Sequence, residues 1–295
     1  MPQPIGTILV AGSTGYLGRH IVAEAGRRGY ATVALARSAG KLADVTPPPG
    51  RIVLAEATSA EDLRGCCEGV DVVFSALGIT RQADGLRYDD VDYGANLALL
   101  REAERAGVRR FVYVSVLHPE HTRHTDMVAA KERFVAALRQ SQLEAVIVRP
   151  TGFFSDMTEF LRMAEAGRVW VFGDGGCKIN PIHGADLAAA CVDAFAADVA
   201  PGERPIGGPE TFTQREIGAL ACAAAARPVR VTGLPLWLID ALLWVLRPLS
   251  RRWWNILAFM SGAGRHDMVG PAHGSHRLAD HFAAEHRSAR AATGR

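Results

Sequence analysis

Three glycines spaced three residues apart, Gly12, Gly15 and Gly18, are the residues of this sequence best suited to binding phosphate. They lie between a short apolar run, long enough for one buried strand, and a stretch with helical periodicity carried by Leu17, Ile21, Val22 and Ala25. Gly12 would allow the tight turn, Gly15 would let the backbone approach a pyrophosphate, and Gly18 would let the helix pack on the sheet. The N–H groups and the positive dipole end of that helix would then receive the phosphates.

A second strand-like run, Ala31–Ala36, follows these glycines. Strand, glycines, helix and strand thus occur in order within about thirty residues, which is the context that a dinucleotide-binding motif requires. We therefore expect a Rossmann βαβ unit that binds a nicotinamide dinucleotide. The alternative is a strand-to-helix turn that binds no ligand.

The end of the second strand predicts which nicotinamide cofactor is bound. A site for NAD usually carries an Asp or Glu about twenty residues past the glycines, where the carboxylate binds the ribose 2′-hydroxyl. This sequence has Arg37 and Ser38 there instead, and an arginine can hold a 2′-phosphate through a charge-assisted contact. We therefore expect NADPH over NADH, the alternative being that Arg37 is an ordinary exposed loop arginine.

The remaining cofactor contacts are expected in the turn itself and where other strands end. Small residues close the fourth strand at Ser75–Gly78, as expected where a backbone passes close to the cofactor ribose. With the three glycines, Arg37 and Ser38, the expected contacts are Ser13, Thr14, Tyr16, Leu17, Glu56, Ala57, Ala76, Leu77, Gly78, Lys131, Pro150, Thr151, Gly152 and Phe153.

Strands and helices alternate over the first half of the chain, which predicts a doubly wound parallel α/β sheet of the Rossmann type, covered on both faces. Further strands are expected at Arg51–Ala55, Asp71–Ala76, Arg110–Val116 and Glu144–Arg149, and crossover helices at Asp62–Glu68, Asp90–Ala106 and Met127–Gln140. Residues 1–150 would form this core. Residues 151–295 would form a small substrate-side subdomain packed on it as one structural unit.

The C-terminal part reads as loops and short elements with three helices, at Ser155–Ala166, Gly184–Ala197 and Gln214–Ala226. Ligands of open α/β folds bind at the carboxyl ends of the strands, where this subdomain should lie. Phe153 and Phe154 directly follow the sixth strand and are expected to wall the nicotinamide or the substrate, although core aromatics would fit equally well. The residues after about Ala284 look frayed.

A family resemblance rests on several motifs, in the order GSTGYLG, SALG, NLALLREAERAGVRRFVYVS, VRPTGFF, FGDG, NPIHGADLA and PIGGPE. This order resembles the atypical short-chain dehydrogenase/reductases, and within them the divinyl chlorophyllide 8-vinyl reductase-like and NmrA-like branch. The resemblance extends to about Leu246. It implies an NADP(H)-binding Rossmann fold that reduces a hydrophobic, often conjugated substrate, or that only senses the cofactor.

The resemblance also singles out Lys131 as the candidate catalytic residue. Ordinary members of the superfamily use a Tyr-x-x-x-Lys pair, and the matching segment here keeps Lys131 but has Met127 in place of the tyrosine. The usual serine is Leu117. Methionine has no proton to give, so an alcohol or ketone substrate becomes doubtful. Lys131 could bind the nicotinamide ribose or donate a proton. The alternative is a solvated helix lysine paired with Glu132 or Asp126.

Other polar side chains are weaker candidates for chemistry. Tyr88 and Tyr93 could supply the missing hydroxyl. His118, His121 and His124 form a cluster before the helix of Lys131, and could supply protons. The residues between these histidines indicate a flexible loop, so we expect no metal site.

Leu234–Leu246 is an apolar stretch with one charge, Asp240, and arginines follow it. It is too short to span a bilayer, which needs about twenty residues. It could be a buried helix of the substrate subdomain, a helix lying in a membrane interface, or a dimer contact. In the first case Trp237 and Trp244 would line the substrate pocket.

Composition limits the partners. The net charge of +2 indicates no nucleic-acid partner, and five cysteines without C-x-x-C spacing suit a reduced, cytoplasmic protein. The first strand begins almost at once without a basic n-region, so we expect no signal peptide. We expect a monomer or homodimer with weak peripheral contact to the inner face of a membrane.

Three hypotheses of function follow. The first is an NADPH-dependent reductase of a hydrophobic conjugated substrate, which works by hydride transfer without the usual tyrosine acid. The second is a non-catalytic regulator that senses NADP(H). The third is a membrane-peripheral protein associated with quinone or with a complex.

Overall fold

The computed structural model describes residues 6–79 and 85–293, which form two compact units. The first unit runs to Val116 and adds residues 126–149 and 187–204. The second comprises residues 117–125, 150–186 and the chain from Pro205 onward. The expected boundary at residue 150, and the description of both parts as one structural unit, stay predictions.

The first unit is built on a seven-stranded sheet in the order β3-β2-β1-β4-β5-β6-β9. The strands from β1 to β6 pair in parallel. The bounds are β1 (Thr7–Ala11), β2 (Ala31–Ala36), β3 (Arg51–Leu54), β4 (Val72–Ser75), β5 (Arg110–Val114), β6 (Glu144–Pro150) and β9 (Gly202–Ile206). Apolar, largely β-branched sequences in β1, β4 and β6 suit strands buried on both faces.

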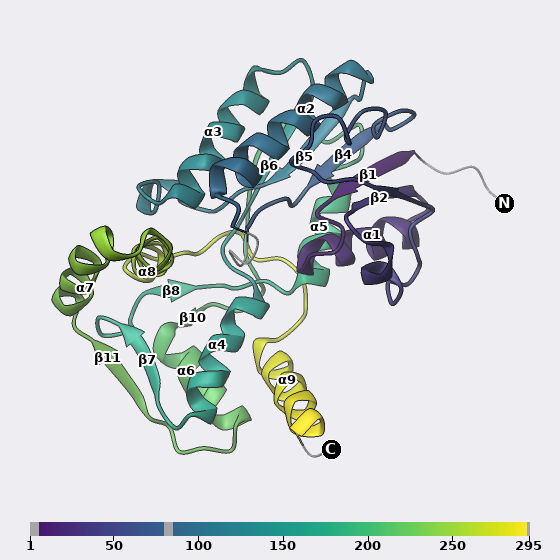
Figure 1. Cartoon of the computed structure of the whole chain (residues 1–295). Helices are drawn as coiled ribbons and strands as arrows, with labels where there is room; N and C mark the ends of the chain where they lie inside the picture. Colours follow the sequence, from purple (N-terminus) through teal and green to yellow (C-terminus); the bar gives the residue numbers. More distant parts are fainter. Residues whose placement is uncertain (1–5, 80–84, 294–295) are drawn as a thin grey trace. The chain divides into compact units, whose positions relative to one another are not determined.

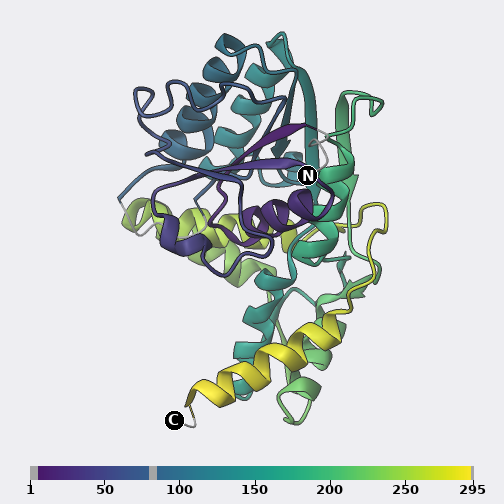
Figure 2. The same cartoon turned by 90° about the vertical axis from the view of Figure 1, so that its right-hand side faces the viewer.

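Helices cover both faces of this sheet, as Figures 1 and 2 show. One buried cluster joins α2 (Asn96–Arg105) and α3 (Asp126–Gln140) to the strands. On the other face lie α1 (Tyr16–Arg27) and α5 (Gly184–Asp193). The predicted doubly wound Rossmann sheet is therefore confirmed.

Two of the expected crossover helices differ from the prediction. Asp62–Glu68 was expected to be helical and instead forms turns. Gly65 and Gly69 adopt φ values of +77° and +70°, a left-handed conformation that interrupts a helix. The helix expected at Asp90–Ala106 begins with one π-helical segment, η2 (Asp89–Ala95), before α2.

The second unit consists of short strand pairs and longer helices. Its strands are β7 (Val169–Phe172) parallel to β11 (Val231–Leu234), and β8 (Lys178–Ile179) antiparallel to β10 (Phe212–Thr213). Its helices are α4 (Phe154–Glu165), α6 (Gln214–Ala224), α7 (Leu236–Leu249), α8 (Arg251–Gly264) and α9 (Leu278–Thr293). Its core lies between α4, α6 and α9.

The C-terminal helix α9 is longer than the sequence predicted. The residues after Ala284 were expected to be frayed, but α9 continues to Thr293. Leu278 and Phe282 are fully buried against α4 and α6, and His286 lies 2.7 Å from Glu165. Tertiary contacts thus anchor this helix against α4 and α6. Across the described residues, no helix combines the length and apolar character needed to cross a membrane.

Candidate functional site

Two glycines of the turn after β1, Gly12 and Gly18, occupy places that a side chain fits poorly, and Gly15 lies close to the same backbone. Gly12 has φ +78°, and a Cβ there would lie 3.0 Å from the backbone of Ala76. A Cβ on Gly18 would lie 2.1 Å from the carbonyl oxygen of Gly12, so that α1 can approach the turn only through a glycine. Gly15 donates its N–H to that same oxygen over 2.9 Å. These contacts leave a narrow backbone cradle that side chains would fill.

The N-terminus of α1 is open toward that cradle. Gly15 caps the helix without a side-chain hydrogen bond, and the first turn has no acid. The Ser13 hydroxyl turns away and donates to the Leu35 carbonyl over 2.7 Å. The N–H groups near Tyr16 and Leu17, with the positive dipole end, therefore suit a pyrophosphate. The cradle fits the expected dinucleotide, and contact of Thr14 and its neighbours with a cofactor stays a prediction.

Arg37 and Ser38 directly follow β2, at the edge where the adenosine ribose of such a cofactor would lie. The Arg37 side chain is 58% exposed, and its guanidinium lies 3.9 Å from the Glu56 carboxylate. Glu56 and Ala57 follow β3, where the Glu56 N–H donates to Asp62. Arg37 therefore has a carboxylate nearby that a 2′-phosphate would replace as its partner.

The loop after β4 brings Gly78 against the side chain of Lys131 on α3. The Lys131 Nζ lies 3.1 Å from Oδ1 of Asp92, whose side chain is fully buried, while that of Lys131 is 13% exposed. A Cβ on Gly78 would lie 2.8 Å from Asp92 Oδ1 and 3.2 Å from the Lys131 Nζ. The other Asp92 oxygen accepts the N–H of Ile79 over 3.1 Å. Lys131 is therefore not the solvated helix lysine of the alternative interpretation, and its ion pair is with Asp92 rather than Glu132 or Asp126.

Burial sets the protonation of this group. Asp92 has a raised pKa because burial disfavours its charge more than Lys131 favours it. Burial opposes the charge of Lys131 as well, but Tyr113 and Asp92 outweigh it and leave the pKa of Lys131 raised. Burial raises the pKa of Tyr113 to about 12. Among the described residues, the Tyr113 hydroxyl and Asp92 Oδ1 lack a well-aligned hydrogen-bond partner. The lysine therefore stays cationic beside buried acceptors.

The positions of the missing hydroxyl acids are occupied by structural residues. Leu117 is buried, and Met127 lies in the first turn of α3. Ser115 donates to Glu132 over 2.9 Å, and Glu132 pairs with Arg149 over 2.8 Å. This buried network ties α3 to β5 and β6.

Proton supply by Tyr88 or Tyr93 stays a prediction. Tyr88 is buried, and the Tyr93 ring lies 4.1 Å from the Arg133 guanidinium. Lys131 thus has two titratable neighbours, Asp92 and Tyr113, and both are fully buried.

The residues after β6 belong to the second unit. Thr151 donates its hydroxyl to the Asn180 carbonyl over 2.6 Å, and the Gly152 carbonyl accepts the Ile182 N–H over 2.8 Å. Phe153 caps α4, whereas Phe154 is buried within the core of the unit. Cofactor or substrate contact of Pro150, Thr151, Gly152 and the two phenylalanines stays a prediction.

Sequence reasoning missed a histidine group beside Phe154. His276 Nδ1 lies 2.8 Å from the Asp186 carboxylate, and its ring stacks on His183 with centroids 4.1 Å apart. The His183 and His281 rings lie 5.6 and 5.5 Å from the Phe154 ring. Asp186 and His276 are ninety positions apart, so no local pattern could have revealed their pairing.

The cluster before α3 has a more defined geometry than the sequence suggested. The ligand atoms of His118, Glu120 and His121 lie within 4.8 Å of one another. His121 also stacks on His266 with centroids 3.9 Å apart. His118 Nδ1 lies 3.0 Å from Glu120 Oε1, a separation compatible with two ligands of one Zn²⁺, whose bonds to histidine nitrogen are about 2.0–2.1 Å. The absence of a metal site stays an expectation.

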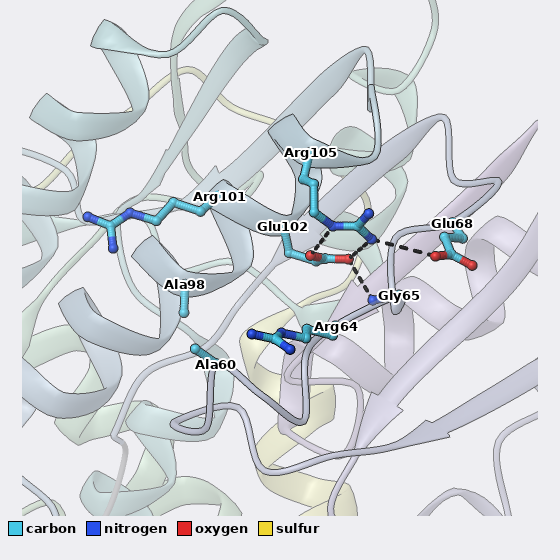
Figure 3. A pocket seen from close by; sticks show the side chains of 8 residues that line it. All are labelled: Ala60, Arg64, Gly65, Glu68, Ala98, Arg101, Glu102 and Arg105. Atoms are coloured by element: carbon cyan, nitrogen blue, oxygen red, sulfur yellow. Dashed lines mark hydrogen bonds and ion pairs between the residues drawn. The ribbon is translucent and has the colours of Figure 1, made fainter.

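Figure 3 shows a depression on the first unit that lies outside the expected cofactor contacts. Its charged side chains are largely paired: Arg105 holds Glu102 at 2.7 Å, and Glu102 accepts the Gly65 N–H over 2.7 Å. Arg64 and Arg101 complete its rim. These contacts tie α2 to the turns at Asp62–Glu68, where a helix was expected. The depression is therefore explained by packing between these two segments.

Trp237 and Trp244 lie on α7 with 70% and 79% of their surface exposed. The interpretation of this stretch as a buried helix is wrong, because Ile239 is the one buried residue of α7. A substrate contact of the two tryptophans stays a prediction.

Comparison with known proteins agrees with this geometry. Residues 12–198 match the protein family described as NAD(P)H-binding. The chloroplastic divinyl chlorophyllide a 8-vinyl-reductase of Oryza sativa subsp. indica is 32% identical over 264 residues, which cover 83% of this chain and 65% of that protein. The chain therefore spans less than two thirds of that relative. The predicted resemblance to the vinyl reductases is confirmed.

One further relative and one solved structure are similar to this chain. The photosystem II assembly factor Ycf39 of Guillardia theta is 27% identical over 79% of this chain and 74% of its own length. The NADPH-dependent quinone oxidoreductase QOR2 of Escherichia coli, solved with NADPH, superposes with a TM-score of 0.75 over 94% of this chain and 99% of its own. At 17% identity this second likeness shows the fold alone.

Proposed function

Because the chain belongs to the NAD(P)H-binding family, we propose that it is an NADPH-dependent reductase of a hydrophobic conjugated substrate. The carrying observation is the buried pair of Lys131 and Asp92, with 3.1 Å between Nζ and Oδ1, against the Gly78 loop. It presents a fixed cation whose neighbouring tyrosine, Tyr113, is fully buried and has a raised pKa, so that it is a poor acid. The relatives named as vinyl reductases support reduction of a conjugated double bond.

In this proposal the N–H groups of the Gly12–Gly18 turn bind the pyrophosphate, and Arg37 with Ser38 binds the 2′-phosphate. NADPH supplies a hydride when bound. Lys131 acts as a ribose anchor rather than as an acid, because a lysine with a raised pKa gives up its proton poorly near neutral pH. Asp92 positions the ammonium toward the ribose hydroxyls.

The lack of an accessible acid favours one substrate class, because Asp92 and Tyr113 are fully buried. A ketone or aldehyde needs a proton at oxygen as the hydride arrives, and Met127 and Leu117 have none to give. A quinone, an enone or an extended conjugated ring delocalises the added charge instead, and water can protonate it afterwards. We therefore favour conjugated acceptors.

The second candidate function is a regulator that binds NADP(H) without turnover. The observation that favours it is the same loss of hydroxyl acids, together with a relative named as an assembly factor. A third candidate is a membrane-peripheral protein associated with quinone or with a complex. The proposal includes a cytoplasmic monomer or homodimer with weak contact to the inner face of a membrane.

The test is NADPH oxidation by the purified protein against quinones, enones, tetrapyrroles and simple ketones. We expect turnover with a conjugated acceptor and none with ketones. Lys131→Ala should raise the KM for NADPH by at least tenfold with a smaller change in kcat, because an anchor binds cofactor in ground and transition state alike. Lys41→Ala is the matched control, since Lys41 is exposed. Tight NADPH binding with no turnover on any acceptor would favour the regulator.

A further inference from the structure

The helices α7 and α8 lie next to each other (Figure 1), and large apolar side chains of both are exposed. Trp244 and Leu249 are the most exposed, at 79% and 74%. The exposed apolar side chains are Leu236, Trp237, Leu238, Leu242, Trp244, Val245, Leu249, Trp253 and Met260. Clusters of this kind on one surface mark sites where a protein meets a partner or a membrane.

The exposed side of α7 is apolar over most of its width. With 3.6 residues per turn, the exposed side chains from Trp237 to Leu249 spread over an arc of roughly 160°. The charged residues of α7, Asp240 and Arg247, are seven positions apart and share a narrow stripe at the edge of that arc. Asp240 is paired with Arg265 over 2.5 Å. A helix that is apolar on both its inner and outer sides is normally buried, either by protein or by a membrane.

Cations flank this apolar arc where α7 passes into α8. Arg247 ends the stripe on α7, and Arg251 and Arg252 open α8, whose sequence contains no acid. The Arg251 guanidinium lies 5.5 Å from the Trp254 ring centroid, and that of Arg252 lies 5.8 Å from the Trp253 ring centroid. Arginine beside tryptophan at the edge of an apolar face is the chemistry of a helix lying in a lipid headgroup region.

We propose that α7 and the start of α8 form a peripheral anchor that lies in the interface of an anionic lipid bilayer. The arginines meet the headgroups while the tryptophans and leucines enter the acyl boundary. This names the element responsible for the membrane contact included in the proposed function, and its test does not depend on turnover.

Length and charge favour a membrane surface over the other occupants. The fourteen residues of α7 extend about 21 Å, too short to span a bilayer but sufficient to lie along it. A second copy meeting this face through its own α7 and α8 would offer these arginines one acid, Asp240, which already pairs with Arg265. An anionic surface instead complements all three cations.

Vesicle flotation of the whole protein tests the anchor. We expect the wild type to float with vesicles of phosphatidylglycerol and phosphatidylcholine at low salt. Binding should fall at least tenfold at high salt and on vesicles of phosphatidylcholine alone. Trp244→Ser should lower binding at least fivefold, and replacement of Arg247, Arg251 and Arg252 by Gln should remove the salt dependence.

The matched control is Trp170→Ser. Trp170 is also exposed and has Arg168 5.5 Å from its ring centroid, but it lies on β7. Circular dichroism verifies that each variant is folded. Three outcomes would overturn the proposal: a folded wild type that never floats, an equal loss in Trp170→Ser and Trp244→Ser, or a dimer that forms without vesicles and is abolished by Trp244→Ser.

Discussion

Replacing Asp92 by Asn removes the charge that faces Lys131 while nearly preserving the volume of the side chain. Asp92 is fully buried, its Oδ1 lies 3.1 Å from the ammonium, and the lysine side chain is 13% exposed. A charge left in a buried site without its partner destabilises a protein by about 3–5 kcal/mol. Since Lys131 keeps some contact with solvent, we expect a loss of about 3 kcal/mol in the free energy of unfolding for Asp92→Asn.

A double variant separates this charge effect from a packing effect. Asp92→Asn with Lys131→Met removes both charges, so no unpaired ammonium remains. We expect it to recover about 1–3 kcal/mol relative to the single variant Asp92→Asn. The assay is urea unfolding followed by circular dichroism for the wild type, both single variants and the double variant. Additive losses, or a loss below about 1 kcal/mol for Asp92→Asn, would refute the argument.

The pH dependence of the same variants adds a second check. In the wild type the raised pKa of Lys131 gives stability that is present below the unfolded pKa and is lost as pH rises through the folded pKa. In Asp92→Asn, burial should lower the pKa of Lys131 instead. Loss of the lysine proton then removes the cost of burying an unpaired charge. The deficit of the variant should therefore shrink between about pH 7 and pH 10. A deficit that is constant over this range would show that Asp92 does not hold the charge of Lys131.

Three further predictions concern the cofactor site and its frame. Arg37→Ala should weaken NADPH binding by about 1.5–3 kcal/mol and spare NADH, as measured by titration with both cofactors; an equal effect on both would remove the role of the arginine. Gly18→Ala should abolish NADPH binding or folding, because its Cβ would lie 2.1 Å from the Gly12 carbonyl oxygen; a folded variant with unchanged affinity would contradict this. Arg149 lowers the pKa of Glu203 by hydrogen bonding, so stability present above about pH 4.3 should fall as pH drops through the folded pKa. Acid unfolding of Glu203→Gln should show a weaker pH dependence than that of the wild type, and an identical profile would count against it.

The sheet and the glycine turn could be predicted because their determinants are local. The Gly12–Gly18 turn and β1 are set by neighbouring residues, and the strands show continuous apolar runs. The helix expected at Asp62–Glu68 failed because apolar spacing was weighed above Gly65 and Gly69, whose positive φ values end any helix. That signal was present in the sequence.

The partner of Lys131 could not be predicted in the same way. Asp92 lies 39 positions away within an acidic run that resembles a solvated helix face, and only the fold brings it to β4 and α3. The outcome for α7 was equally inaccessible, because a sequence shows that a helix is apolar but not whether neighbours cover it. Long-range packing decided both cases.

The central claim is hydride transfer from NADPH to a conjugated acceptor. The most direct measurement uses NADPH deuterated at C4 of the nicotinamide on the transferred face and an enone or vinyl tetrapyrrole acceptor, on which the transferred deuterium forms a C–D bond that does not exchange, with mass spectrometry of the reduced product. The account predicts that the product gains one deuterium per turnover, and that the Lys41→Ala control behaves like the wild type. A product without deuterium, or bound NADPH that no acceptor oxidises, would contradict it.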